Sequence, residues 1–314
     1  MDAIRIENLT RTFGDFNAVD NLTLNVAEGE IFGLVGPDGA GKTTTMRMLT
    51  AILNPTSGDA WVAGHHIVKG AEPIKEEIGY MSQRFGLYPD LTVMENVNFY
   101  ADIYEVPRQG RNAKIDELLA FSNLTPFKKR MAGKLSGGMK QKLGLVCALI
   151  HTPKVLFLDE PTNGVDPVSR RDFWRILYQL LREHVTIFVS TAYLDEAERC
   201  NRVGLLNKGK LLACGTPDEV KQLMRGTIYE IRASEPRKAS LLLREKLDGD
   251  SVGLFGDRVH VVTNRPDRVL QVSQSVLAEA NVSLNNIRVI APSLEDVFIS
   301  VLDNEHIEAE NDDI

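Results

Sequence analysis

The chain of 314 residues has 36 Lys and Arg against 43 Asp and Glu, and 43% of its residues are hydrophobic. This composition excludes a collagen-like fibre and a chain that is disordered throughout, and the length allows two domains, or one large and one small. The net charge of −7 argues against a basic nucleic-acid-binding surface, so we expect no nucleic-acid partner.

The sequence contains no run of 18 apolar residues, so we do not expect the chain to span a bilayer by itself. Residues 1–5 alternate between polar and apolar and lack the apolar core of a signal peptide. The three Cys are too few and too widely spaced for a disulfide framework or a zinc site. These features predict a soluble, cytosolic protein.

The first third of the chain begins with predicted strands. Residues 4–7 and 22–26 alternate in polarity, and residues 31–35 are continuously apolar, as expected of a strand that is buried on both faces. A glycine-rich loop at 36–41 and a helix at 42–52 follow. This order predicts a buried strand that runs through a glycine-rich loop into a helix.

The middle of the chain is predicted to be mostly helical from about residue 84 to residue 150. Apolar runs at 155–158 and 185–189 then predict two strands, with an amphipathic helix at 168–183 between them. A strand, a helix and a strand at this spacing imply parallel pairing with a right-handed crossover.

The pattern changes near residues 224–226, and the part beyond predicts a small α+β domain. We place short strands at 228–232, 258–262 and 286–290, and helical stretches at 236–248 and 266–280. The acidic residues 303–314 lack apolar periodicity and are expected to be a mobile tail. We therefore divide the chain into a first domain at 1–225 with a helical subdomain at about 84–150, a second domain at 226–302 and the tail.

A phosphate-binding motif lies between the third predicted strand and the helix after it. It reads Gly-Pro-Asp-Gly-Ala-Gly-Lys-Thr at residues 36–43, which fits G-x-x-x-x-G-K-[ST]. Residues without side chains let backbone N–H groups approach phosphate oxygens closely, and the helix start adds its dipole. Lys42 would then reach the β- and γ-phosphates, and the Thr43 hydroxyl could bind Mg²⁺. The alternative is a plain glycine-rich turn with a solvated lysine.

Two carboxylates, Asp159 and Glu160, end the apolar run at 155–158. A strand buried on both faces delivers the side chains at its carboxyl end to the crevice where α/β sheets bind ligands. Asp159 would hold Mg²⁺ directly or through water, and Glu160 is the candidate base for an attacking water. Taken alone, a solvated acidic turn would explain these residues better, but the motif at 36–43 favours the functional interpretation.

A second glycine motif, Leu-Ser-Gly-Gly-Met-Lys-Gln at residues 135–141, opens a predicted helix about twenty residues before the acidic strand end. Ser136 is a good N-cap, and the glycines permit close approach at the positive end of the helix dipole. By itself the motif could be only a helix cap. Its position relative to the acidic strand is the diagnostic feature.

The three motifs, in this order, resemble the ATPase subunit of an ATP-binding cassette (ABC) transporter over about residues 1–225. Phe13 stands where the family places an adenine-stacking aromatic, most often tyrosine. Gln83 matches the glutamine loop, and residues 164–166 match a loop at the dimer interface. Without the family, a core aromatic and a solvated amide would be the better interpretations of Phe13 and Gln83.

The resemblance implies an α/β fold of the P-loop NTPase type, with a mixed-sheet core, antiparallel β and helical subdomains, and the small α+β domain at the C-terminus. It implies an ATPase with ATP and Mg²⁺ as cofactors, in which two cassettes enclose two nucleotides. The catalytic residues would be Glu160, Gln83 and Lys42, and the metal ligands Thr43, Gln83 and Asp159. The nucleotide would bind to Phe13, Gly36, Pro37, Asp38, Gly39, Ala40, Gly41, Lys42, Thr43, Thr44, Gln83 and Asp159, and to Ser136, Gly137 and Gly138 of the opposite cassette.

One family feature is missing. The family has a histidine after the strand at 185–189, but this chain has Ala192 there, and His184 lies at the other end of that strand. A single preorganised polar contact to developing charge is worth about 10²–10³-fold in rate. We therefore expect slow hydrolysis at this chain's own site, unless a neighbouring residue or water compensates. A cassette with one weakened site usually works beside a complete one.

The segment at 291–298 resembles one near the end of bacterial exporter-type cassettes, which pair with integral-membrane permeases. We therefore predict the motor subunit of an exporter, bound to the inner face of the cell membrane. Its second cassette would be an identical chain, a different chain or a fused copy, and the C-terminal domain would support dimerisation or regulation. The alternatives are a nucleotide-sensing regulatory cassette and a soluble ABC ATPase outside transport. The interval between the two glycine motifs is too short for the coiled coil of chromosome-maintenance cassettes.

Overall fold

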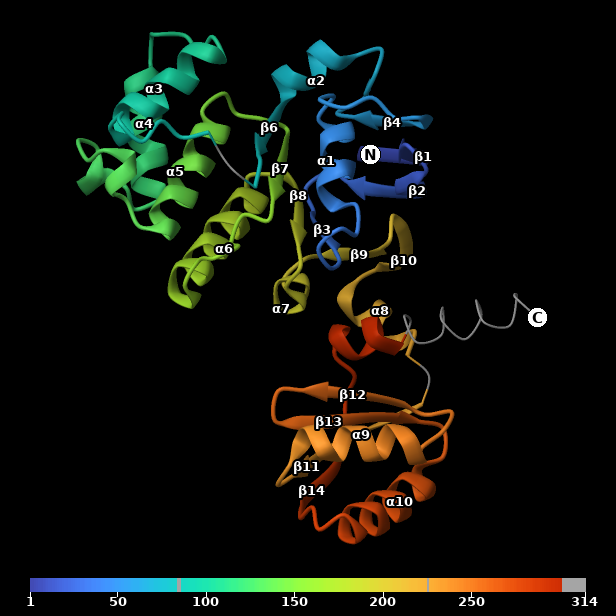
Figure 1. The fold of residues 1–314 in the computed structure, drawn as a ribbon. Coiled ribbons are helices and arrows are strands. Elements are labelled where there is room, and N and C mark those ends of the chain that lie inside the picture. The colour runs from blue at the N-terminus through green and yellow to red at the C-terminus, as the bar shows by residue number, and fades with distance from the viewer. Residues whose placement is uncertain (84–85, 225, 301–314) are drawn as a thin grey trace. The chain divides into compact units, whose positions relative to one another are not determined.

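The computed structural model describes residues 1–83, 86–224 and 226–300. The chain separates into two compact units, Met1–Cys214 and Gly215–Ile314 (Figure 1). This division comes earlier than the boundary expected after residue 225. The sequence pattern changes near residue 225, but the second unit begins before that, with helix α8 (Pro217–Gln222). A capping box of Thr216 and Glu219 starts this helix.

A six-stranded sheet forms the centre of the first unit. Strand β3 pairs in parallel with β8 and β9, and β7 pairs in parallel with β6 and β8. The parallel pairing expected from the strand–helix–strand pattern is therefore confirmed. In spatial order the strands are β10 (Lys210–Gly215), β9 (Arg202–Asn207), β3 (Ile31–Val35), β8 (Thr186–Thr191), β7 (Val155–Asp159) and β6 (Ile78–Met81).

A second, antiparallel sheet contains the N-terminal strands. Its order is β2 (Phe16–Ala27), β1 (Asp2–Phe13), β4 (Ser57–Val62) and β5 (His65–His66). The first two strands are much longer than the alternating residues 4–7 and 22–26 indicated. The register of β1 on β2 shifts at several points, and each shift breaks the two-residue period by which a strand is recognised in the sequence.

Helix α1 (Lys42–Leu49) packs where the two sheets face each other. Met46 lies in one continuous core with Phe32, Phe157 and Phe188 of the parallel sheet and with Ile4 of β1. The helix ends before the predicted residue 52, because Ala51 has a left-handed backbone with φ of 55°. The loop that precedes α1 is thus continuous with a helix whose apolar residues are buried in the core.

Three of the remaining helices of the first unit form a helical subdomain. Helices α3 (Val93–Ile103), α4 (Arg111–Phe121) and α5 (Gly137–Leu149) share a separate apolar core. Figure 1 shows α5 and α6 (Pro167–Arg182) on the opposite side of the parallel sheet from α1. The short helices are α2 (Ala71–Glu77), α7 (Leu194–Ala197) and the 3₁₀ turns η1 (Thr125–Phe127) and η2 (Ala132–Lys134). In the described part of the chain, no helix combines the length and the apolar character needed to cross a membrane.

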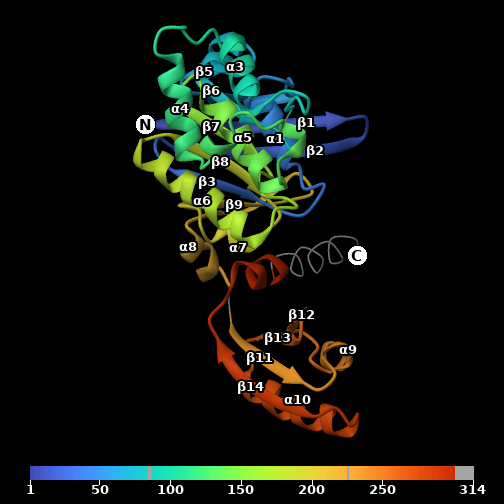
Figure 2. The same cartoon turned by 90° about the vertical axis from the view of Figure 1, so that its left-hand side faces the viewer.

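The second unit is a β-α-β-β-α-β domain. Its antiparallel sheet has the order β12-β13-β11-β14, which is the ferredoxin-like arrangement. Helices α9 and α10 cover one face, as Figure 2 shows, over a core that includes Tyr229 and Ile231. The element bounds are β11 (Thr227–Ala233), α9 (Pro236–Lys246), β12 (Ser251–Phe255), β13 (Arg258–Thr263), α10 (Pro266–Glu279) and β14 (Leu284–Ile290). Strand β12 was not predicted, and the other five elements were.

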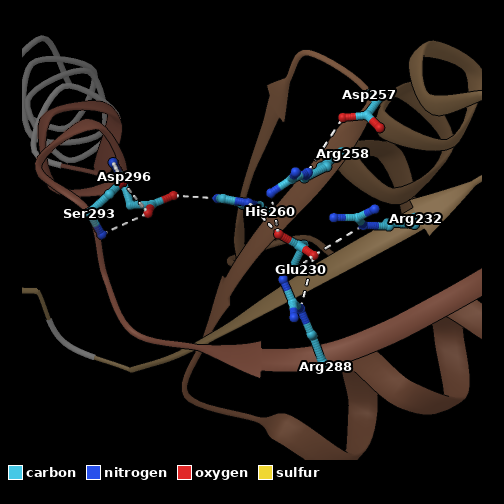
Figure 3. A network of polar contacts seen from close by, with 8 residues as sticks. All are labelled: Glu230, Arg232, Asp257, Arg258, His260, Arg288, Ser293 and Asp296. Atoms are coloured by element: carbon cyan, nitrogen blue, oxygen red, sulfur yellow. Dashed lines mark hydrogen bonds and ion pairs between the residues drawn. The ribbon is translucent and has the colours of Figure 1, made fainter. Parts of the chain in front are cut away.

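A polar network occupies one face of this sheet (Figure 3). The side chain of Glu230 is 3% exposed and bonds to three arginines, Arg232, Arg258 and Arg288, at 3.2, 3.0 and 2.9 Å. Burial opposes its ionisation, but the hydrogen bonds from Arg288 and Arg232 and the nearby charges outweigh burial and lower the pKa of Glu230 to about 2. One buried carboxylate therefore joins β11, β13 and β14.

The same face holds the last described helix, residues 294–300. Ser293 is its N-cap: the Ser293 hydroxyl accepts a bond from the Asp296 backbone N–H, and the Asp296 carboxylate accepts from Ser293 N–H and Oγ–H. The other Asp296 oxygen lies 2.6 Å from Nδ1 of His260 on β13 (Figure 3). Ser293 thus caps the helix, and the pair of Asp296 with His260 attaches the helix to the sheet.

Candidate nucleotide-binding site

The glycine-rich loop connects the buried strand β3 to the N-terminus of α1, as the motif predicts. Gly36 and Gly41 cannot be replaced without displacing backbone. A Cβ at Gly36 would lie 2.1 Å from the Leu206 carbonyl oxygen, and one at Gly41 would lie 2.3 Å from the Ala18 carbonyl oxygen. Gly41 also has φ of 106°. The loop is therefore pressed between β2 and β9, with no room for a side chain at Gly36 or Gly41.

Lys42, the first residue of α1, is 4% exposed. Its Nζ donates to the carbonyl oxygens of Gly36 and Pro37 at 2.8 and 2.9 Å, and it lies 3.2 Å from Oε1 of Glu160. The ammonium group is thus held over the loop by two carbonyls and one carboxylate. The other loop residues of the predicted set are the exposed Asp38 and Gly39 and the buried Ala40, while Thr44 is half-buried in the first turn of α1.

Asp159, at the end of β7, lies beside the start of α1. Its Oδ1 accepts bonds from the Thr43 hydroxyl at 3.1 Å and the Ser190 hydroxyl at 2.6 Å. Its Oδ2 is buried and has no hydrogen-bond partner among the described residues. An orphaned carboxylate oxygen next to a threonine hydroxyl suits a hard cation such as Mg²⁺, which prefers oxygen ligands. The residues present therefore fit a magnesium ion.

Glu160 follows Asp159 in a strained conformation, with φ of 47°. Its backbone N–H donates to Oγ of Ser190 at 3.0 Å. Besides Lys42, its side chain accepts bonds from Nε2 of Gln83 at 2.9 Å and Nδ2 of Asn163 at 3.2 Å. The Glu160 carboxylate therefore has three side-chain donors, which are Lys42, Gln83 and Asn163.

Gln83 comes two residues after strand β6, and its side chain is exposed apart from the contact with Glu160. It also lines a surface pocket of about 300 Å³ together with Leu87, Pro89, Ala132, Gly133, Lys140 and Gln141. Gln83 thus lies between the Glu160 carboxylate and this pocket on the helical subdomain.

The loop after β8 borders the same site. Thr191, Ala192 and Tyr193 line a pocket of about 250 Å³ with Asp38, Glu160, Thr162 and Asn163. Ala192 offers only a methyl group here, and His184 precedes β8 at the far end of the strand. The side chains of Ser190, Asn163 and Tyr193 were not predicted as site residues. The sequence did offer one signal for them. It predicted a parallel strand–helix–strand unit at 155–189, and the carboxyl ends of neighbouring parallel strands lie at the same edge of a sheet.

Phe13 lies at the tip of the β1–β2 hairpin. Its ring is 47% exposed, and the Arg11 guanidinium lies 4.5 Å from the ring centre. Phe16, its partner across the turn, is 57% exposed and was not predicted. The hairpin approaches the phosphate loop through Ala18, whose carbonyl lies against Gly41. The structure therefore presents two aromatic rings at this hairpin, where the sequence indicated one.

Ser136, Gly137 and Gly138 form the start of α5, with Ser136 as the N-cap. Gly138 is buried against α6: a Cβ there would lie 2.4 Å from Cβ of Ser169, whereas one at Gly137 would meet nothing within 4 Å. Among the described residues, no hydrogen bond or ion pair links these three residues to Lys42, Thr43, Asp159 or Glu160. The chain therefore brings together Lys42, Thr43, Gln83, Asp159 and Glu160, and presents the second glycine motif elsewhere on its surface.

The loop at 164–166 leads from the site to α6. Asp166 caps that helix, accepting bonds from the backbone N–H groups of Val168 and Ser169. Gly164 has φ of 70°, and Val165 is buried. The short segment between Glu160 and α6 is thus fixed at both ends.

A glycine loop between a buried parallel strand and a helix, with an aspartate at the end of a neighbouring strand, defines a P-loop nucleotide-binding domain. The ABC transporter family model matches residues 19–163, and the model of the C-terminal domain of DrrA1-3-like ATP-binding proteins matches residues 215–302. The chain belongs to the ATP-binding proteins of ABC transporters.

Its relatives agree with this assignment. The chain is 45% identical over 293 residues to the probable multidrug ABC transporter ATP-binding protein YbhF of Escherichia coli, covering 92% of this chain but only 50% of YbhF. It is 35% identical to the bacitracin transport ATP-binding protein BcrA of Bacillus licheniformis, over 95% of this chain and 97% of BcrA. It is 33% identical to the daunorubicin resistance ATP-binding protein DrrA2 of Streptomyces coeruleorubidus, over 95% and 94%.

Solved structures show the same fold. CbiO1 of Clostridium perfringens, part of an ABC transporter complex, matches with a TM-score of 0.65 at 26% identity, covering 78% of this chain and 97% of that one. An ATP-binding subunit of an ABC transporter matches with a TM-score of 0.64 at 27% identity, over 70% of this chain and 92% of that one. The expected cassette fold of the P-loop NTPase type is confirmed.

Proposed function

We propose that the chain is the ATP-binding and ATP-hydrolysing motor subunit of an ABC exporter. The observation that supports this most strongly is the convergence of Lys42, Thr43, Asp159 and Glu160 at the carboxyl ends of adjacent parallel strands. This geometry suits phosphoryl transfer, which depends on positioning and charge stabilisation. The relatives named for multidrug, bacitracin and daunorubicin handling favour export.

In this proposal each residue has a distinct role. The loop amides and Lys42 bind the phosphates, and Phe13 stacks on the adenine. Thr43, Asp159 and Gln83 would hold Mg²⁺, which would supply positive charge to offset that of the phosphates. Glu160 acts as the base that orients and deprotonates the attacking water.

We further propose that a second cassette completes the site. The first turn of α5, with exposed Ser136 and Gly137, would face the γ-phosphate bound by the partner. ATP would therefore close the pair, and hydrolysis would release it. Since this chain spans half of YbhF, the second cassette could belong to an identical chain, to a different chain or to the same polypeptide.

The membrane partner would be a permease, which would place the protein on the inner face of the cell membrane. The pocket beside Gln83 supports this proposal, because a segment that binds there would touch a residue in contact with Glu160. Gln83 would then couple binding at this groove to the state of the nucleotide site. The second compact unit would support dimerisation or regulation.

Ala192 favours slow hydrolysis at the chain's own site. Its methyl group borders the pocket beside Glu160 and can neither donate nor accept a hydrogen bond. The second candidate function is accordingly a cassette that binds ATP mainly to hold the pair closed, with turnover at the partner's site.

Calorimetry and a membrane pull-down test the proposal. The purified chain should bind ATP in the presence of Mg²⁺, Lys42→Ala should abolish most of the binding heat, and Glu160→Gln should retain it. A tagged chain that contains Glu160→Gln, captured from membranes with ATP present, should retain an integral-membrane protein. No binding heat with the unmodified chain would refute the nucleotide function, and capture without a membrane protein would refute the exporter assignment.

A further inference from the structure

Glu160 has three side-chain donors, and two of them are needed elsewhere when nucleotide binds. Lys42 must reach the β- and γ-phosphates, as the lysine of a phosphate-binding loop does. Gln83, in its proposed role, turns to Mg²⁺. The third donor, Asn163, contacts Oε2 of Glu160 at 3.2 Å and belongs to neither the phosphate loop nor the metal site. Asn163 is therefore the donor that can remain hydrogen-bonded to Glu160 throughout the reaction.

Asn163 is itself held in place. Its Oδ1 accepts a bond from the Tyr193 hydroxyl at 3.4 Å, which leaves Nδ2 free to donate to Glu160. The guanidinium of Arg170 covers the Tyr193 ring at 4.3 Å from its centre. The Arg170 Nε atom lies 3.3 Å from Oε1 of Glu196.

Glu196 anchors this chain of contacts. Its side chain is fully buried and accepts bonds from the hydroxyls of Thr162 and Thr191, the latter at 2.9 Å. Thr162 adjoins Asn163, and Thr191 accepts a bond from the Tyr193 backbone N–H at 3.0 Å. One buried carboxylate thus fixes both loops from which Asn163 and Tyr193 extend.

We propose that Asn163, held by Tyr193, is the positioning residue for Glu160 during ATP hydrolysis. This inference rests on the proposed function and deepens it. At a site where Ala192 supplies no polar group, the contact from Asn163 keeps the carboxylate directed at the water. Asn163 touches neither nucleotide nor metal in this proposal, so its loss should slow hydrolysis and leave ATP affinity unchanged.

Single-turnover hydrolysis by the full chain, with protein in excess over radiolabelled ATP, tests the inference. Asn163→Ala should lower the rate constant about 10–100-fold, the range seen when a hydrogen-bond partner that orients a metal ligand is removed. Tyr193→Phe keeps the ring under Arg170 and removes only the hydroxyl, so it should cause a smaller loss. The affinity for ATP, measured by calorimetry, should stay within about twofold in both variants, and the double variant should be no slower than Asn163→Ala alone.

Tyr178→Phe is the matched control. Tyr178 lies in the second half of α6 and has the same 37% exposure as Tyr193, and its hydroxyl donates to the Arg199 carbonyl at 3.1 Å rather than to Asn163. The Tyr178→Phe variant should hydrolyse ATP at the same rate as the unmodified chain. Thermal unfolding of each variant checks that the fold is retained, and Tyr193→Phe still tests the inference if Asn163→Ala is unstable.

The possible outcomes distinguish a failure of the positioning role from a failure of the proposed ATPase function. If the unmodified chain is faster than Glu160→Gln but Asn163→Ala matches the unmodified chain, the positioning role is wrong and the ATPase stands. A parallel loss of affinity and rate would assign Asn163 to binding and overturn the inference. Multiplicative losses in the double variant would overturn the role of Tyr193. If the unmodified chain is no faster than Glu160→Gln, the proposed hydrolysis fails, and the inference fails with it.

Discussion

The Nζ atom of Lys42 lies 3.2 Å from Oε1 of Glu160, and the two side chains are only 4% and 9% exposed. One charge stands at the start of α1 and the other after the end of β7, so the pair links the phosphate loop to the candidate base. In the proposed function, a triphosphate bound to the loop would draw Lys42 away from Glu160. Nucleotide binding and release of the candidate base would then be coupled through one ion pair.

The first prediction concerns this pair in the protein without nucleotide. Lys42→Ala should destabilise the first unit more than the double variant Lys42→Ala with Glu160→Gln, because the single change leaves the largely buried Glu160 carboxylate without an opposite charge. The coupling free energy should be about 1–3 kcal/mol. Urea unfolding followed by tryptophan fluorescence measures it, since Trp61 and Trp174 both lie in the first unit.

A matched control for that cycle is the exposed pair of Glu72 and Lys75, at 2.7 Å with side chains 80% and 50% exposed. Its coupling should be at most about 0.5 kcal/mol, because water screens the charges. Equal coupling in the two cycles would contradict the claim that burial makes the pair of Lys42 and Glu160 strong.

The second prediction concerns Ala192. Replacing it with His restores a polar group beside Glu160 and should raise the single-turnover hydrolysis rate by about 10²–10³-fold at most, the value of one preorganised contact. Ala192→Leu adds bulk without a polar atom and should give no increase. If Ala192→His is no faster than the unmodified chain, another group already supplies the contact, and the expectation of slow hydrolysis is wrong.

The third prediction separates two glycines of α5. Gly138→Ala places a Cβ 2.4 Å from Cβ of Ser169, so it should lower the stability of the first unit by about 1–3 kcal/mol. Gly137→Ala meets nothing within 4 Å in its own chain and should leave stability within about 0.5 kcal/mol.

Gly137→Ala should nevertheless weaken ATP-dependent association of two cassettes, because the added methyl group would obstruct the partner's phosphate. Analytical ultracentrifugation of the Glu160→Gln background with and without ATP measures this. Unchanged association would argue that the start of α5 does not face nucleotide.

The fourth prediction is a pH dependence in the second unit. The pKa of Glu230 falls from 4.5 to about 2 on folding, so its ionised form stabilises the fold above pH 4.5. That contribution should be lost progressively as the pH falls from 4.5 toward 2. Glu230→Gln should already be less stable at pH 7, by about 1–3 kcal/mol, because the three arginines lose a charged partner.

Hydrogen exchange at amides of β11, β13 and β14, where Glu230 and its arginine partners lie, reads this stability locally. The difference in protection between the unmodified chain and Glu230→Gln should shrink below pH 4.5. A difference that stays constant from pH 7 to pH 3 would show that the ionisation of Glu230 does not stabilise the domain.

Much of the fold could be predicted because local signals agree with the structure. The apolar run that becomes β3, the glycines after it and the helix from Lys42 form a contiguous unit. The same holds for the run before Asp159 and for most elements of the second unit. Strands β6 and β9 of the six-stranded sheet were missed, because Gly79 and Gly204 interrupt their short apolar runs, and β4, β5, β10 and β12 were missed as well.

The sequence by itself determined the class of the protein and predicted Lys42, Thr43, Asp159 and Glu160 as site residues, since a motif of fixed spacing holds the chemistry of phosphate binding. Only the tertiary structure decided which side chains hold Glu160. Gln83, Asn163 and Lys42 come from three separate segments, and their donors meet at one carboxylate. Parallel strands place their carboxyl ends at one edge of the sheet whatever their distance along the chain, so contacts made across that edge leave no local pattern in the sequence.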